Sequence, residues 1–303
     1  MTIFDAELSA IGDAEYQPIA QTEQSVVLRL GDKWLALDDW ANGWIVTAVD
    51  MGAPVSREAT YASPGGDGTV DNTARVGGRN VILAVSLVGS NPQALLDMLA
   101  PYLAQRARPT LEVATVLGEA RRSLLVRHTG DMDVKWERPG LLDVTIGFRS
   151  VGTPYWQGPK KVATAWPDEA TPGRAFPFTF PLSFPSAAGI GAALIKTTGT
   201  VDTTWVARIF GPITAPEIIL AATGERVVFK TTLTVGAGDY LTVDSGNRTA
   251  LLNGLVGSPR YTHLNFPATD WFRLAPGDQS IRLFGTGTNT STQAEITWKD
   301  AFL

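Results

Sequence analysis

Cysteine is absent from the 303 residues of this chain. Its absence excludes disulfide bridges, thiolate nucleophiles and every zinc or iron–sulfur site that is built on sulfur. It also fits assembly in a reducing cytosol. A chain of this length corresponds to about two domains, and each is long enough to bury a core without such cross-links.

Charge is also scarce, because Asp, Glu, Lys and Arg make up 18% of the residues and the net charge is −5. Proteins that hold nucleic acid need clustered Lys and Arg, whereas the basic clusters here are pairs, such as Arg121-Arg122 and Lys160-Lys161. The N-terminus is acidic, and the longest run of small apolar residues, 187–195, is far shorter than the ~20 residues of a membrane helix. We therefore expect a soluble protein without a targeting segment, a membrane span or a surface that holds DNA.

Histidine occurs only twice, and neither His128 nor His263 accompanies the G-x-S-x-G pattern of a serine hydrolase. His128 stands near Asp131 and Asp133, a set that could bind a metal, but a surface loop is the default interpretation. The sequence therefore predicts no catalytic triad and no metal site.

Other motifs that carry chemistry are weak. The glycine-rich run at 65–68 lacks the spacing and the terminal glutamate of a calcium loop, and we expect a loop or hairpin arm from there to Arg75. Acidic residues at predicted strand ends are interpreted as solvated rather than as a glycosidase pair. They are Glu217, Glu225, Asp239 and Asp244. No catalytic residue and no cofactor are predicted.

Alternation of apolar and polar residues predicts strands in the first half of the chain. The clearest segments are 81–88 and 142–148, with further strands expected at 44–49 and 111–115. One helix is expected near 92–104, with Asn91 as its N-cap and Pro92 in its first position. Its leucines recur at helical spacing, and Pro101 should kink or end it early.

The second half is expected to begin after a segment rich in proline and aromatic residues. The predicted organisation is an N-terminal β-domain at 1–152, a linking segment at 153–190 and a C-terminal β-sandwich at 191–303. In the last part, turn signals recur every 8–12 residues between short apolar runs, as in all-β sandwiches. The expected strands are 204–210, 217–222, 226–233, 240–244, 249–252, 280–284 and 295–298.

The order of these features resembles the distal tail protein of siphophages. The N-terminal resemblance rests on the helix after Asn91-Pro92, the segment 109–113 and the strand 144–148. The C-terminal resemblance rests on four runs that occur in the family's order. They are Gly211-Pro212-Ile213, Gly238-Asp239-Tyr240-Leu241-Thr242-Val243-Asp244, Ala250-Leu251-Leu252-Asn253-Gly254, and Asp270 to Ile281.

The resemblance implies a β-sandwich-like ring domain with one helix, followed by a galectin-like or carbohydrate-module-like β-sandwich. It implies a homohexameric ring in the virion, made in the host cytoplasm, that joins the tail tube to the hub or baseplate of the tail tip. The partners would be the tail tube protein, the hub protein and the tape measure protein, with DNA only passing through the lumen. The acidic balance suggests a lumen that is neutral or negative, so that DNA does not stick.

Two alternatives stay open. In the first, the C-terminal sandwich binds carbohydrate on the host surface, through Trp271, Tyr261 or Trp205. In the second, the sandwich hides a glycan hydrolase, which would depend on one of the acidic residues.

Overall fold

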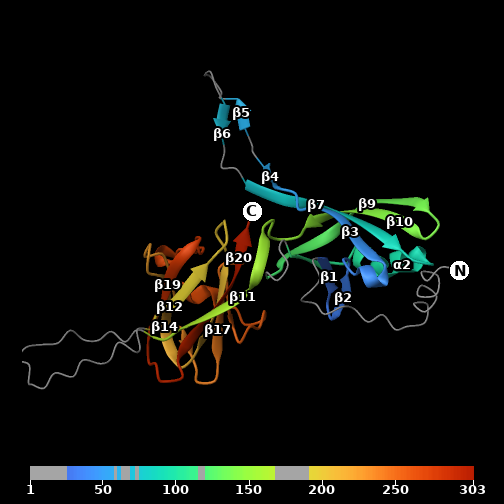
Figure 1. Ribbon diagram of the computed structural model, residues 1–303. Helices are drawn as coiled ribbons and strands as arrows, with labels where there is room; N and C mark the ends of the chain where they lie inside the picture. Colours follow the sequence, from blue (N-terminus) through green and yellow to red (C-terminus); the bar gives the residue numbers. More distant parts are fainter. Residues whose placement is uncertain (1–25, 58–59, 63–68, 72–74, 115–119, 168–190) are drawn as a thin grey trace, which may run out of the picture. The chain divides into compact units, whose positions relative to one another are not determined.

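Two compact units make up the chain in the computed structural model, which describes residues 26–57, 60–62, 69–71, 75–114, 120–167 and 191–303. Unit 1 comprises residues 1–159 together with 302–303, and unit 2 comprises residues 160–301. Each unit is described separately below. Both are built mainly from antiparallel strands, as predicted (Figure 1).

One sheet of unit 1 contains β2 (Lys33–Ala36), β1 (Val26–Leu30), β8 (Thr110–Val113) and the start of β9 (Arg122–Arg138), in this order. The first residues of β11 (Trp156–Ala165) pair with β9. Side chains of β1 and β8 are buried on the face of this sheet that lies toward the core.

The other sheet of unit 1 has the order β9-β10-β7-β3, with β10 at Leu141–Ser150, β7 at Arg75–Val88 and β3 at Trp44–Asp50. Alternate residues of β10 and β7 are buried, in the register that places Val144 opposite Val85. β4 (Pro54–Arg57) pairs with the start of β7. The remaining short elements are β5 (Thr60–Ala62), β6 (Thr69–Asp71) and the 3-10 helix η1 (Trp40–Asn42).

Strands β5 and β6 pair with each other as an antiparallel hairpin. The expected loop or hairpin arm is therefore a hairpin in its described residues. The glycine-rich run at 65–68 lies outside them.

The α-helix of the described residues, α2 (Pro92–Leu103), begins and ends close to the predicted positions. The side chain of Asn91 accepts a hydrogen bond from the backbone N–H of Ala94 at 3.3 Å, which satisfies one of the free donors of the first turn. Leu99 and Tyr102 are buried against the core of unit 1. Pro101 lies in the last turn, and the helix ends two residues later.

Unit 2 encloses its core between two sheets. One has the order β18-β17-β13-β20, and the other has the order β12-β19-β14-β15 with β16 beside β14. The strands are β12 (Ala193–Thr197), β13 (Trp205–Phe210), β14 (Ile213–Leu220), β15 (Arg226–Val228), β16 (Thr234–Val235), β17 (Tyr240–Asp244), β18 (Thr249–Leu252), β19 (Gly277–Thr286) and β20 (Gln293–Phe302). Two 3-10 helices, η2 (Tyr261–His263) and η3 (Phe266–Ala268), follow β18.

The prediction for residues 128–133 was wrong, because they lie within strand β9 rather than in a surface loop. β9 is 17 residues long, and most side chains of its outer half are exposed, including the apolar Met132 and Trp136, while Val134 packs against the core. Part of the segment expected as a linker forms strand β11, while residues 168–190 lie outside the described part of the chain.

Candidate interface surfaces

The described residues contain no group of three or more His, Cys, Asp or Glu side chains that could hold a metal ion. The Nε2 atom of His128 lies 3.3 Å from the backbone oxygen of Asp131, so it contacts the main chain and not the carboxylate. That carboxylate instead accepts a hydrogen bond from Thr129 at 3.1 Å. None of the helices in the described ranges is long and apolar enough to cross a membrane.

The four acidic residues of the hydrolase alternative each take part in separate local interactions. They do so in turns or between neighbouring strands, where such carboxylates stabilise the local backbone. Glu217 pairs with Arg226 (3.2 Å), Glu225 accepts from Thr223 (2.8 Å), Asp239 accepts from Asn253 (2.8 Å), and Asp244 accepts from the backbone N–H of Gly246 (2.8 Å).

The three aromatic residues of the carbohydrate alternative have different environments. Trp205 is 0% exposed, and its Nε1–H donates to the backbone oxygen of Phe272 at 3.2 Å, so a ligand in solvent does not reach its ring. Trp271 is half-buried and packs against the core of unit 2. Tyr261 is 50% exposed, and its ring lies 4.8 Å from that of Phe266, a residue that sequence analysis missed.

The sheet β9-β10-β7-β3 of unit 1 has two open edges among the described strands. β3 pairs only with β7, and beyond Arg127 β9 pairs only with β10. Unpaired strand edges present a row of N–H and C=O groups that another strand can extend. Because successive strands of this sheet are antiparallel, the two edge strands run in opposite directions.

Apolar side chains lie exposed near both edges. At the β3 edge, a cleft of about 350 Å³ is lined by side chains that include Trp40, Ile45 and Leu95, and Trp40 is 78% exposed. On β9, Trp136 is 56% exposed and Met132 is also exposed. An exposed tryptophan at each of two opposite edges is unusual for a surface that stays in water, and tryptophan is enriched in protein interfaces.

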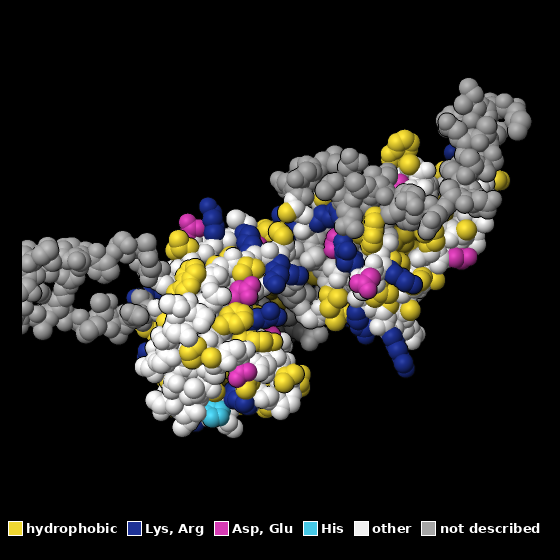
Figure 2. Space-filling model, turned by 90° about the horizontal axis from the view of Figure 1, so that it is seen from below, with side chains coloured by type: hydrophobic (Ala, Val, Ile, Leu, Met, Phe, Trp, Pro, Cys, Tyr) yellow, Lys and Arg dark blue, Asp and Glu magenta, His cyan; other side chains and the backbone are white. Residues whose placement is uncertain are grey.

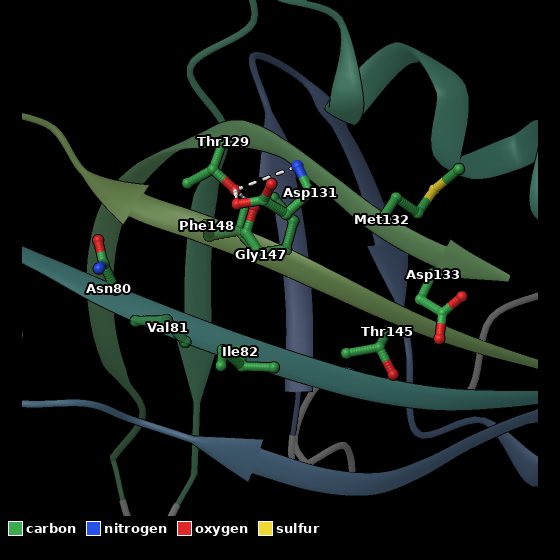
Figure 3. A pocket seen from close by; sticks show the side chains of 10 residues that line it. All are labelled: Asn80, Val81, Ile82, Thr129, Asp131, Met132, Asp133, Thr145, Gly147 and Phe148. Carbon is green, nitrogen blue, oxygen red and sulfur yellow. Dashed lines mark hydrogen bonds between the residues drawn. The ribbon is translucent and has the colours of Figure 1, made fainter.

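The face of this sheet that lies away from the core carries charges of both signs, because the register also places Arg127 and Arg149 on it. Figure 3 shows a hollow on it, of about 430 Å³, where Thr129 bonds to both Asp131 and Gly147. Alternation along β9 and β10 places Asp133, Lys135 and Asp143 on this face. The pKa of Lys135 is raised by its hydrogen bond and ion pair with Glu137, and further by those two aspartates.

Lys and Arg side chains do not form one continuous basic patch on the molecular face drawn in Figure 2. There, Lys and Arg side chains are interspersed with Asp, Glu and hydrophobic ones. This distribution does not favour tight binding of a phosphate backbone, in agreement with the net charge of −5.

Comparison with known proteins finds a family model that matches the second unit and solved structures that resemble the chain. Residues 198–302 match the family model of the siphovirus-type tail component, C-terminal domain. The chain is also similar to the crystal structure of the Dit protein of phage SPP1, which is called a paradigm of the hub adsorption apparatus in phages that infect Gram-positive bacteria. The TM-score is 0.59 at 14% identity, and the match covers 92% of this chain and 100% of the other.

A chain of the phage P2 baseplate, in its activated conformation with calcium, matches 91% of this chain and 97% of its own length. Its TM-score of 0.47 at 14% identity does not by itself establish a common fold. Among curated proteins, none matches this sequence significantly. Residues 198–302, in the second unit, thus match the siphovirus-type tail component family, and the chain as a whole shares the fold of the SPP1 Dit protein.

Proposed function

We propose that this chain is a non-catalytic structural subunit of a long-tailed phage tail tip, and that unit 1 assembles head to tail into a closed ring. The observation that carries the proposal is the four-stranded sheet of unit 1 with its two open edges. Edge β9 of one copy would pair with edge β3 of the next copy. The ring would join the tail tube to the hub or baseplate.

Strand direction makes this pairing feasible. β3 and β9 lie at opposite edges of the sheet and run in opposite directions. A neighbouring copy in the same orientation therefore presents its β3 antiparallel to β9, which is the more stable arrangement of two strands. Each copy has one β3 edge and one β9 edge, so the contact between copies is heterologous. Every edge is paired when the copies close into a ring, whereas an open chain of copies leaves one edge unpaired at each end.

Exposed apolar side chains lie at both edges, with Ile45 on the face away from the core and Met132 and Trp136 on the core-side face. Trp40 and Ile45 flank the cleft at the β3 edge, while Met132 and Trp136 extend from β9. Burial of these side chains on assembly would contribute the hydrophobic part of the association free energy, at about 25 cal/mol per Å² of apolar surface removed from water.

The uncovered face of the sheet would line the ring. The opposite face is covered by the core and α2, so the uncovered face is the one that can turn toward the axis. On this face Asp131, Asp133 and Asp143 are balanced by Arg127, Lys135 and Arg149, so the ring would present a mixed rather than a basic lining to passing DNA. The expected partners are further copies, the tail tube, the hub and the tape measure protein.

Size-exclusion chromatography with light scattering tests the ring. The wild-type chain should elute as a defined multiple of 32.4 kDa. Trp136→Glu and Ile45→Lys each place a charge at one edge and should shift the mass to that of a monomer. Leu194→Lys, on the exposed side of β12 in unit 2, is the matched control and should leave the mass unchanged. A wild-type monomer at micromolar concentration, or a full ring in Trp136→Glu, would contradict the proposal.

A further inference from the structure

Two exposed aromatic rings lie together on unit 2. Tyr261 in η2 and Phe266 in η3 are 50% and 48% exposed, and their ring centroids are 4.8 Å apart with 61° between the planes. One ring thus presents its edge to the face of the other, which leaves an angled apolar surface open to solvent. Neither ring is needed to fill the core cluster of this unit.

The backbone beneath the two rings is fixed at several points. Leu264, between them in the sequence, is fully buried. The N–H of Lys230 donates to the backbone oxygen of His263 at 2.8 Å, and the N–H of Asn265 donates to that of Val228 at 2.9 Å. A ligand that bound here would find the rings already positioned, and little conformational entropy would be lost on binding.

Basic and polar groups surround this aromatic pair. Lys230 Nζ donates to the backbone oxygen of Thr262 at 3.0 Å, and Arg260 precedes Tyr261 in the chain. His263 Nδ1 lies 3.1 Å from Thr232 Oγ1. Residues 254–268 contain no Asp or Glu, although the chain as a whole has a net charge of −5.

We propose that this surface, formed by Tyr261 and Phe266 with Lys230 and Arg260 beside them, binds an anionic polysaccharide. The C–H faces of sugar rings pack on aromatic rings, and carboxylate or phosphate groups on the polymer would pair with the two cations. Only a few cations are present, too few to hold a nucleic acid backbone, which is bound by about 6–10 phosphate contacts. The site lies wholly in unit 2 and does not depend on the ring.

Affinity gel electrophoresis of the full chain tests the proposal. Native gels would contain polygalacturonate, which has sugar rings and carboxylates, neutral dextran, or single-stranded DNA. Polygalacturonate should slow the wild-type chain relative to a gel without polymer, less so at high salt because ions screen the cations. Dextran and DNA should slow it little. Equal retardation by dextran would overturn the role of charge, stronger retardation by DNA would overturn the ligand class, and no retardation by polygalacturonate would overturn the site.

Variants assign the binding to these rings. Tyr261→Ala and Phe266→Ala should each weaken retardation about tenfold in apparent Kd, the scale of one stacking contact. Tyr261→Phe keeps the ring and should bind like the wild type, while Lys230→Gln should weaken binding and reduce its salt dependence. Trp166→Ala, which removes another exposed aromatic side chain of unit 2, is the matched control and should change nothing. Unchanged retardation in both alanine variants, with folding verified by circular dichroism, would refute the site. Trp136→Glu, which disrupts the proposed ring, should keep this binding, so the two proposals fail separately.

Discussion

The buried ion pair between Lys161 and Asp300 gives unit 2 a pH-dependent part of its stability. The side chain of Asp300 is 2% exposed, and its Oδ2 accepts hydrogen bonds from Lys161 Nζ and from Thr198 Oγ1, both at 2.6 Å. Burial raises the pKa of Asp300, but the hydrogen bonds from Lys161 and Thr198 lower it by more, so that its net pKa lies below the usual range. The folded state therefore holds Asp300 as a carboxylate whose burial depends on Lys161.

Lys161→Met should destabilise unit 2 at neutral pH. Loss of one partner of a buried ion pair costs about 3–5 kcal/mol, and Lys161 is partly exposed, so screening reduces the expected loss to about 1–3 kcal/mol. In the wild type, the contribution of Asp300 is present above its unfolded pKa of about 3.9 and is lost as the pH falls through the lower folded pKa. In the variant, the hydrogen bond and ion pair from Lys161 are absent, so the folded pKa of Asp300 is higher than in the wild type and protonation relieves part of the penalty. The difference between wild type and variant should therefore be largest at pH 7 and shrink toward pH 4.

Urea unfolding read by pulsed hydrogen exchange and mass spectrometry would measure this difference, because peptides of unit 2 are resolved from those of unit 1. Lys160→Met changes an exposed neighbouring lysine and is the matched control, with an expected change within about 0.5 kcal/mol. A loss in Lys161→Met that is the same at pH 7 and pH 4 would refute the linkage to Asp300. A loss equal to that of Lys160→Met would refute the ion pair itself.

Two further substitutions test the packing of each unit by the same urea assay. Trp205→Ala removes a fully buried ring that packs against Phe272. It should lower the free energy of unfolding of unit 2 by about 3–5 kcal/mol and leave that of unit 1 unchanged. A loss near zero would show that Trp205 is not a core residue. Gly43→Ala places a Cβ 2.0 Å from the backbone oxygen of Val88, at a φ of +81°, and should destabilise unit 1 by more than about 1 kcal/mol. Gly89→Ala is the control, because a Cβ at Gly89 meets nothing within 4 Å. Equal effects of the two substitutions would contradict the close approach of Gly43 to Val88.

Sequence patterns predicted those elements whose signals are local. Strands β17 and β18 have the predicted bounds, because alternating residues sit between strong turn signals on both sides. Helix α2 was predicted from its Asn91-Pro92 start, and it forms with the expected cap. In these segments, residues that are close in sequence determine the structure.

Elements that depend on distant contacts were missed or misplaced. Residues 128–133 of strand β9 were expected as a loop, although residues 131–137 alternate between polar and apolar side chains and Val134 packs against the core. Trp205 was one of three candidates for sugar contact in the carbohydrate alternative, yet it is fully buried and packs against Phe272, which is far from it in the sequence. The pairing of Tyr261 with Phe266 needs two successive 3-10 turns, which have only weak sequence signals. Likewise, the open edges of unit 1 follow only from the strand order.

Cross-linking between the two edges tests the central claim most directly. Because the chain contains no cysteine, only the introduced thiols react with the cross-linker. The double variant Thr47→Cys with Lys135→Cys places one thiol on β3 and one on β9. Within one copy these strands are separated by β7 and β10, about 14 Å at the usual strand spacing, so a shorter bismaleimide can join them only between copies. The account predicts a ladder of covalent oligomers from the double variant that ends at one largest species, the hexamer if six copies close the ring, and no ladder from either single variant. Monomers alone from a double variant that still assembles like the wild type would contradict edge-to-edge pairing of β9 with β3.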